Sequence, residues 1–478
     1  MPVSMAVNQN IVELEYAVRG PIPQRAAELA RAGRRTIPCN IGNPQALGQS
    51  PITFYRQVLS FLEAPTALAR ERRFRGAFDA NSSAFLGVDE SDFVDPWVIE
   101  YCEKMLGHLG SGIGAYTDSN GPAFIREAVA GFIDRRDGAD SGSGVPADPD
   151  SIFLTNGASE AVRFIIDLLI SDAADGIMIP IPQYPLYSAT IKKAGGAQVE
   201  YHPDEEKGWT LDRAILDDAI CRARDRSITV KAIVIINPAN PTGAILPAEG
   251  ALEVVDFAEE NRLAIIADEV YQDNLYGAEF VSFAKLVGKR DIPLFSLHST
   301  SKGFHGECGR RGGYVEIRNP IDIEGADVRL RDLFFKQASV ALCSNTTGQA
   351  LTYIMVTPPP EGSPPHGRYQ REKETILSAL QDKATMIREA FEEMREVECF
   401  GRTGAMYLFP RLGRLPGGKT DFDYCMALLE ETGLCTVNGS GFGQRPGTHH
   451  LRIAFLPPKE MLDQVLPDWI AFHNAYVQ

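Results

Sequence analysis

A single lysine, Lys302, stands among hydroxyl groups and glycines after an apolar run that predicts a buried strand. The run covers residues 292–297, and the lysine follows within Ser299-Thr300-Ser301-Lys302-Gly303. A lysine that loses its proton through burial can attack a carbonyl group and bond to it covalently. The glycines leave room for a flat molecule, and the guanidinium groups of Arg310 and Arg311 suit a phosphate. These residues predict carbonyl chemistry, although a glycine-rich surface turn would have the same local composition.

Short apolar runs predict the strands that would position this lysine. They alternate with segments typical of helices and cover residues 152–155, 177–180, 199–202, 232–236, 263–267 and 293–297. Continuous apolar strands separated by helices indicate an α/β fold with a largely parallel sheet. Residues 313–317 are expected to return as an edge strand of the same sheet.

Polar groups recur where these strands end. Asn240 follows the run 232–236, and Asp268 and Tyr271 follow the run 263–267. The segment 157–159 (Gly157, Ala158 and Ser159) lies between a strand and a helix, so its backbone N–H groups should point at an anion. Because open α/β sheets bind ligands at the carboxyl ends of their strands, this placement predicts an active site there.

Each of these residues also has an ordinary structural explanation. An aspartate at a strand end, such as Asp268, can simply cap a helix. Asn240 precedes a proline and could be a turn residue, and it could hold both roles at once. Tyr184 lies beside prolines and could be a partly buried core tyrosine. Cys308 is near the lysine, but we interpret it as a packing residue.

Composition excludes several classes of partner. The formal net charge of −16 argues against nucleic acid or an anionic membrane as the main partner. The N-terminus lacks the pattern of a signal peptide, and no apolar run reaches the length of a membrane span. The eight cysteines are scattered without the spacing of metal ligands. We therefore expect no metal site and a reducing, cytoplasmic location.

Several separate motifs together resemble one family. The context of Lys302, the box Asn-Pro-Ala-Asn-Pro-Thr-Gly at 237–243, the box Asp-Glu-Val-Tyr at 268–271 and Arg452 resemble the fold-type-I aminotransferases of class I and II. Four further boxes resemble the alanine aminotransferase branch of that family, at residues 16–22, 40–45, 112–119 and 306–309. Any one box is a weak signal, but their order and spacing fit from about residue 11 to residue 455.

The resemblance implies the domain organisation and the cofactor. A chain of 478 residues is long enough for more than one domain. We expect residues 1–50 to form an N-terminal arm and part of the small domain, and residues 356–478 to form the rest of a small α+β domain. Residues 51–355 would be the large domain, with a mostly parallel seven-stranded sheet between helices and with 51–95 as a helical insertion. This large domain would bind pyridoxal 5′-phosphate.

The resemblance also assigns roles around the ring of that cofactor. Lys302 would bond to the cofactor's aldehyde carbon and then carry the proton of the reaction. Asp268 would keep the ring nitrogen protonated, so that the ring accepts electrons. Tyr271 and Asn240 would hydrogen-bond to the ring hydroxyl oxygen, and Tyr184 would stack on the ring. Lys302, Asp268 and Tyr271 are thus the expected catalytic residues.

The phosphate is expected at the segment 157–159. Ser299 and Arg310 match the family's other phosphate contacts, whereas we expect Arg311 to form a structural salt bridge. Tyr116 matches a contact that the neighbouring subunit contributes. The resemblance therefore implies a homodimer with shared active sites.

Substrate recognition is expected from three residues. Arg452 would hold the α-carboxylate as a two-pronged pair, with Gly42 lying against it and Asn240 nearby. The sequence does not show which residue would bind the distal carboxylate of glutamate. Arg19 is a candidate because it belongs to an N-terminal segment that could fold over the site.

The activity implied is transfer of the amino group of L-alanine to 2-oxoglutarate, by a ping-pong reaction that yields pyruvate and L-glutamate. Glutamate:glyoxylate transfer or a broader amino-acid specificity is the nearest alternative. A lyase of the aminocyclopropane-carboxylate synthase type could use the same boxes. A non-catalytic regulator that binds the cofactor is disfavoured, because the acidic chain shows no basic DNA-binding domain.

Overall fold

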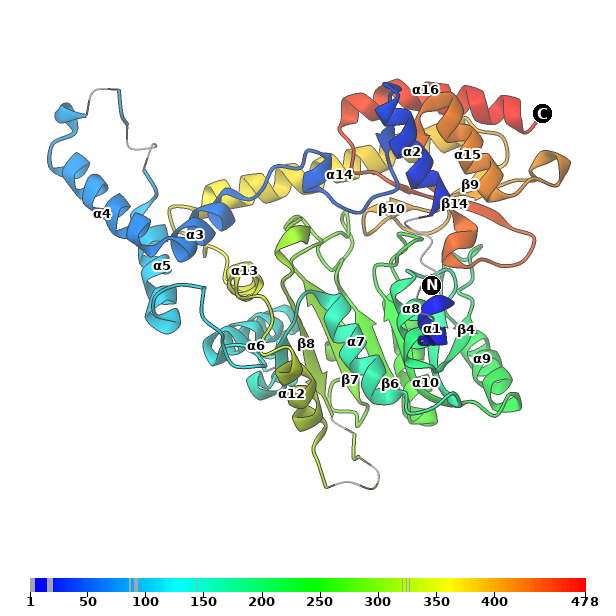
Figure 1. The fold of residues 1–478 in the computed structure, drawn as a ribbon, viewed down its shortest axis with the longest axis horizontal. Coiled ribbons are helices and arrows are strands. Elements are labelled where there is room, and N and C mark those ends of the chain that lie inside the picture. The colour runs from blue at the N-terminus through cyan, green and yellow to red at the C-terminus, as the bar shows by residue number, and fades with distance from the viewer. Residues whose placement is uncertain are drawn as a thin grey trace.

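The described residues form three sheets, of seven, five and two strands, with helices around them and a helical projection to one side (Figure 1). The computed structural model describes residues 5–14, 20–85, 87–89, 93–142, 144–319, 321–323, 325 and 327–478. The projection consists of α3 (Thr53–Glu63), α4 (Pro65–Ala80) and α5 (Pro96–Leu109). The long helix α14 (His366–Glu392) runs above the larger sheet, from the projection to the C-terminal part of the chain.

The larger sheet has seven strands, as the sequence predicts. Their order is β2 (Ile152–Leu154), β8 (Gly313–Arg318), β7 (Leu294–Ser299), β6 (Ala264–Asp268), β5 (Thr229–Ile236), β3 (Asp175–Pro180) and β4 (Ala197–Tyr201). Only β8 runs antiparallel to its neighbours among these strands. The prediction that residues 313–317 form an edge strand is wrong, because β8 lies between β2 and β7. Every residue of β8 is buried, and pairing on both sides satisfies its backbone there.

Helices cover both faces of this sheet and create two apolar layers. Side chains alternate along a strand, so Val234 and Ile266 face α7 while Ile233 and Ile265 face α10. The helices of this part are α6 (Ala123–Asp137), α7 (Ala158–Leu169), α8 (Leu186–Ala194), α9 (Arg213–Asp225), α10 (Ala248–Asn261), α11 (Phe283–Val287), α12 (Leu330–Val340) and α13 (Thr346–Val356). The sheet is therefore buried on both faces, as its apolar strands predict, and the α/β fold class is confirmed.

The smaller part combines segments from near the N-terminus with the C-terminal part of the chain. β14 (His449–Ala454) pairs with β10 (Tyr407–Leu408), β11 (Arg411–Leu412) and β13 (Val437–Asn438), and β9 (Val397–Glu398) pairs with β11. A separate pair joins β1 (Ile37–Pro38) to β12 (Leu434–Cys435). The surrounding helices are α2 (Pro21–Arg31), α15 (Asp421–Thr432) and α16 (Lys459–Tyr476), while the short α1 (Gln9–Val12) contacts α8. The division of the chain at residues 50 and 355 stays a prediction.

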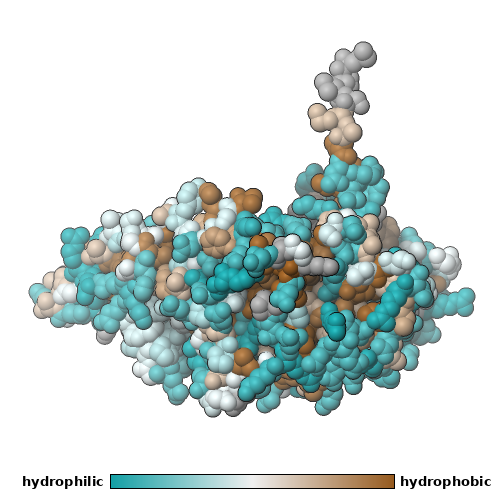
Figure 2. Space-filling model, turned by 90° about the horizontal axis from the view of Figure 1, so that it is seen from below, coloured by the Kyte–Doolittle hydropathy of each residue, from teal (hydrophilic) through white to brown (hydrophobic). Residues whose placement is uncertain are grey.

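Hydrophilic residues predominate on the face shown in Figure 2, with apolar residues scattered between them. Within the described ranges, none of the helices combines the length and the apolar character that crossing a membrane requires.

Candidate active site

One cavity of about 1010 Å³ gathers residues from the seven-stranded sheet and from the smaller part of the chain. It lies where β5, β6 and β7 end, and the residues that follow β1 and the strands β10 and β14 complete its wall. Of the residues that the sequence predicts for the site, the cavity is lined by Gly42, Ala158, Ser159, Tyr184, Asn240, Asp268, Tyr271, Ser299, Lys302 and Arg452. Residues separated by as many as 410 positions in the chain thus meet at one place.

Lys302 reaches across this cavity to the N-terminal segment. Its Nζ donates a hydrogen bond of 2.9 Å to the carbonyl oxygen of Gly42. Burial acts to lower the pKa of the Lys302 ammonium, but neighbouring Tyr407, Cys308 and Tyr184 together raise it above its ordinary value. The neighbouring groups therefore outweigh the effect of burial on the pKa of Lys302. The lysine is held as a cation, and it has to give up a proton before it can attack a carbonyl.

Asp268 ends β6 with one satisfied and one unsatisfied oxygen. Oδ2 accepts a hydrogen bond of 2.7 Å from the hydroxyl of Tyr187, whereas Oδ1 is buried and has no partner among the described residues. Burial raises the pKa of Asp268, and the Tyr187 hydrogen bond opposes that shift. A buried carboxylate oxygen without a donor is costly, so Oδ1 marks a place for the N–H of a ligand. Tyr187 was not predicted from the sequence.

The N-terminus of α7 supplies the donors at another end of the cavity. Gly157 precedes the helix with φ of 77°, and the free N–H groups of the first turn follow it. Arg311 lies beside this turn, with Nη2 donating to Asn156 O at 2.9 Å and to Ser159 Oγ at 3.2 Å. Amides, a hydroxyl and a guanidinium that converge in this way suit a phosphate.

The structure brings Arg311 to this cavity, and Arg310 is not among the residues that line it. Arg311 has a left-handed backbone, with φ of 52°, at the end of a short helical turn over Cys308–Arg310. That conformation turns its side chain toward α7. The salt bridge expected for Arg311 is not present, since no carboxylate within the described ranges lies at ion-pair distance from it.

Arg452 is fully buried and surrounded by neutral groups. Its Nη1 donates to Asn240 Oδ1 at 3.1 Å, and its Nη2 donates to the carbonyl oxygen of Asn40 at 2.7 Å. The guanidinium carbon lies 4.3 Å from the ring centre of Tyr407 and 4.7 Å from that of Phe442. In the part of the chain that the structure describes, no carboxylate neutralises this cation. A buried guanidinium without a counterion is a binding site for an anion.

Tyr407 is a central residue that the sequence reasoning missed. Its hydroxyl lies 3.4 Å from that of Tyr271. A Cβ atom added to Gly42 would stand 1.9 Å from the Tyr407 hydroxyl oxygen and 3.4 Å from Lys302 Nζ. Burial raises the pKa of Tyr407, but the charges of Lys302 and Arg452 outweigh it and lower the pKa below its ordinary value. Only a glycine fits at position 42 beside this hydroxyl.

The predicted residue Tyr116 lies away from the cavity. The side chain of Tyr116 is on the surface, with a relative exposure of 79%. Its assignment to a neighbouring subunit's site stays a prediction. Arg19, the candidate for a distal carboxylate, lies outside the described residues.

The chain is similar to several known proteins over nearly its whole length. The family model described as aminotransferase class I and II matches residues 88–467. Alanine aminotransferase 1 of Homo sapiens is 42% identical, over 98% of this chain and 94% of its own length. Glutamate–glyoxylate aminotransferase 1 of Arabidopsis thaliana is 39% identical, over 98% of this chain and 95% of its own. A solved structure of an alanine aminotransferase from Pyrococcus furiosus is 26% identical and superposes with a TM-score of 0.76, covering 98% of this chain and 100% of that one.

Proposed function

The chain belongs to the class I and II aminotransferase family, whose members use pyridoxal 5′-phosphate, and from this we propose that it transfers the amino group of L-alanine to 2-oxoglutarate. Alanine would leave as pyruvate in one half-reaction, and 2-oxoglutarate would leave as L-glutamate in the other. The name of the human relative, alanine aminotransferase 1, supports alanine as the amino donor. The Arabidopsis relative is named for glutamate and glyoxylate, which makes that pair of substrates the second candidate.

The residues of the cavity fit the family's cofactor. The unpartnered Oδ1 of Asp268 suits a protonated ring nitrogen, and the N-terminus of α7 with Arg311 suits the phosphate. Lys302 supplies an amine for the aldehyde carbon. When bound, the cofactor supplies an electron-accepting ring and a carbon that can carry an amino group.

The side chains of this protein would then do the positioning and the proton transfer. Lys302 holds a proton on Nζ, and the carbonyl of Gly42 orients that atom toward the cavity. Asp268 holds a negative charge against the ring, while Tyr187 fixes one of its oxygens. Tyr271 and Tyr407 place two hydroxyl groups beside the lysine. General acid–base catalysis needs this kind of fixed donor near the reacting atoms.

The single observation that carries the proposal is the position of Arg452 opposite Lys302. Both residues line one cavity, where Lys302 donates to the carbonyl oxygen of Gly42 and Arg452 donates to that of Asn40, two residues earlier. The buried guanidinium, oriented by Asn240 and Asn40, would hold the α-carboxylate of the amino acid. An α-amino acid bound in this way would present its Cα to the lysine.

We also propose a homodimer in which Tyr116 completes the partner's site, and a cytoplasmic location. The exposure of Tyr116 supports the first, because a buried side chain could not reach another subunit. The scattered cysteines, all of them free, support the second. The large domain at 51–355 and the small domain at 1–50 and 356–478 belong to the same proposal.

Half-reactions test the substrates directly. The cofactor-loaded protein is mixed with one amino acid at a time, and the absorption spectrum of the cofactor is followed. We expect L-alanine and L-glutamate each to convert the spectrum, and 2-oxoglutarate to restore it after alanine. Restoration by glyoxylate but not by 2-oxoglutarate would favour the second candidate. The assignment is wrong if neither alanine nor glutamate changes the spectrum while other amino acids do.

A further inference from the structure

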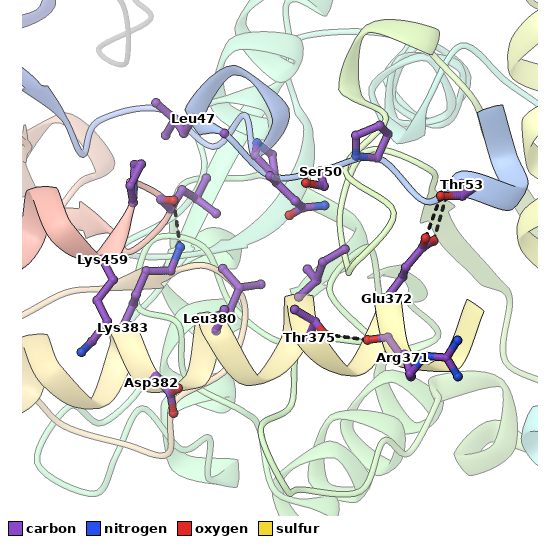
Figure 3. A pocket seen from close by; sticks show the side chains of 18 of the residues that line it. Leu47, Ser50, Thr53, Arg371, Glu372, Thr375, Leu380, Asp382, Lys383 and Lys459 are labelled. Atoms are coloured by element: carbon purple, nitrogen blue, oxygen red, sulfur yellow. Dashed lines mark hydrogen bonds between the residues drawn. The ribbon is translucent and has the colours of Figure 1, made fainter. Parts of the chain in front are cut away.

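Figure 3 shows a second cavity, of about 700 Å³. Its walls are the segment 44–53, one side of α14 and the residues 456–459 that precede and begin α16. Gly42 and Asn43 line the active-site cavity, and Pro44 lines this one, so the segment 42–44 separates the two. The second cavity is therefore distinct from the site of the aminotransferase reaction.

Most of the wall is apolar. Leu47, Ile376, Leu380 and Leu456 line the cavity together with prolines from the two flanking segments. At the end near α3, both oxygens of Glu372 accept hydrogen bonds from Thr53, at 2.7 and 2.8 Å. Both oxygens of that carboxylate thus already have hydrogen-bond donors, and the middle of the cavity is lined by aliphatic side chains.

Lys383 lines the cavity, and no carboxylate of the described residues forms an ion pair with it. Its Nζ donates to the carbonyl oxygens of Leu456 and Pro457, at 2.9 and 3.2 Å. An ammonium group has three N–H donors, and among the described residues neither a third acceptor nor a carboxylate lies within reach of it. Figure 3 shows Lys383 turned inward, whereas Asp382 points away from the cavity and Lys459 lies at its edge.

From this arrangement we propose that the cavity binds an aliphatic monocarboxylate, with its carboxylate on Lys383 and its chain along Leu380 and Ile376. A half-buried cation without a paired carboxylate favours an anion, and the aliphatic side chains beside it favour a ligand with a hydrocarbon chain over one with a second charge. Glu372 and Lys383 are eleven residues apart on α14, which corresponds to about 16 Å along the helix. That length accommodates an eight-carbon chain. The proposal is independent of the substrates proposed above.

The charge state of Lys383 gives the binding a defined pH dependence. Burial lowers the pKa of Lys383 to about 8. The other titratable groups that act on it are the thiol of Cys39, whose pKa burial raises, and the carboxylate of Glu460 on α16. Further charged residues of the cavity wall are Arg368, Arg371, Glu372, Asp382 and Lys459. The carboxylate of the ligand binds only the protonated, positively charged form of Lys383. The affinity for the monocarboxylate should therefore fall by about tenfold between pH 7 and pH 9.

Calorimetric titration of the cofactor-loaded protein with octanoate tests the proposal. We expect one octanoate to bind per chain at pH 7, and octan-1-ol, which has the chain without the charge, to bind at least tenfold more weakly. Lys383→Met should weaken octanoate binding at least tenfold. The matched control Lys459→Met, on the rim of the same cavity, should leave it unchanged.

Two further results show whether octanoate binds in the cavity of Lys383 or elsewhere on the protein. Lys383→Arg keeps the positive charge at every pH tested, so it should bind octanoate without the fall between pH 7 and pH 9. A Lys383→Met protein that binds octanoate as tightly as the wild type would overturn the proposal. Binding that is lost in Arg452→Lys and retained in Lys383→Met would also overturn it, because octanoate would then occupy the substrate cavity.

Discussion

The hydroxyl of Tyr187 donates a hydrogen bond of 2.7 Å to Asp268 Oδ2 and leaves Oδ1 of the same carboxylate free of partners among the described residues. The two oxygens thus have different tasks. One anchors the carboxylate to α8, and the other is available to a ligand. Tyr187 acts through Asp268 and is a positioning residue.

Replacing Tyr187 by Phe should impair cofactor binding more than substrate binding. Loss of the hydrogen bond lets the pKa of Asp268 rise further, so less of the carboxylate carries a charge. A hydrogen bond to a charged group is worth about 1.5–3 kcal/mol, which corresponds to about a tenfold to hundredfold loss of cofactor affinity. Fluorescence titration with the cofactor measures the loss, and the KM for alanine should change little. The control is Tyr201→Phe, which removes another buried hydroxyl, one that donates to Val234 O at 2.6 Å.

The two adjacent arginines should differ in their effect on the cofactor. Arg311→Met removes the guanidinium beside Ser159 and should lower cofactor affinity by about tenfold or more. Arg310→Met changes a residue outside the cavity and should have little effect. Equilibrium dialysis of both variants checks the pair. Equal losses of cofactor affinity in the two variants would show that Arg311 does not bind the phosphate from its position in the cavity.

A methyl group at position 42 should disable the site through Tyr407. The added Cβ of Gly42→Ala would stand 1.9 Å from the Tyr407 hydroxyl oxygen, so the two segments must move apart. We expect kcat/KM for alanine to fall at least a hundredfold. In the double variant Gly42→Ala, Tyr407→Phe the colliding oxygen is absent, and part of the loss should be recovered. If the losses of kcat/KM in the two single variants are additive in the double variant, the collision with the Tyr407 hydroxyl is not the cause of the Gly42→Ala loss.

Acid should destabilise the protein partly through His298. Burial lowers the pKa of this histidine to about 3, although nearby Asp273 acts against the shift, while His305 and Arg136 add to it. The unfolded chain takes up the proton near pH 6.5 and the folded chain does not, so stability is present above pH 6.5 and is lost as the pH falls. Between pH 7 and pH 5 this one group contributes a loss of about 2 kcal/mol.

Thermal unfolding at the two pH values measures that loss. His298→Phe keeps a ring in the same place and should show a smaller drop in Tm between pH 7 and pH 5 than the wild type. The control His449→Gln changes a histidine that is not buried and should reproduce the wild-type drop. If Tm of His298→Phe falls between pH 7 and pH 5 as much as that of the wild type, His298 does not contribute to the loss of stability.

The sequence predicts the large sheet and most of the cavity because both depend on local patterns. Apolar runs predict the strands. Asp268 is the last residue of β6, and Lys302 and Asn240 lie in the loops that follow β7 and β5. The position of β8 between β2 and β7 depends on pairing between distant segments, which a local pattern does not contain.

The residues that were missed share a physical reason. Arg310 and Arg311 have the same chemistry, and the left-handed backbone of Arg311 decides which one faces α7. Tyr187 lies 81 residues from Asp268, and Tyr407 lies 136 residues from Tyr271. Their roles arise from packing between segments, and nothing in their own surroundings in the sequence distinguishes them from core tyrosines.

The hydrogen bond from Arg452 to the carbonyl of Asn40 spans 412 positions and has a consequence for the newly made chain. Lys302 and Asp268 leave the ribosome long before β14 does. Until β14 is synthesised and pairs with its neighbours, a nascent chain can carry the lysine but has no buried guanidinium to hold a substrate. The order of synthesis therefore keeps the reactive amine without its substrate-binding guanidinium until β14 has been made.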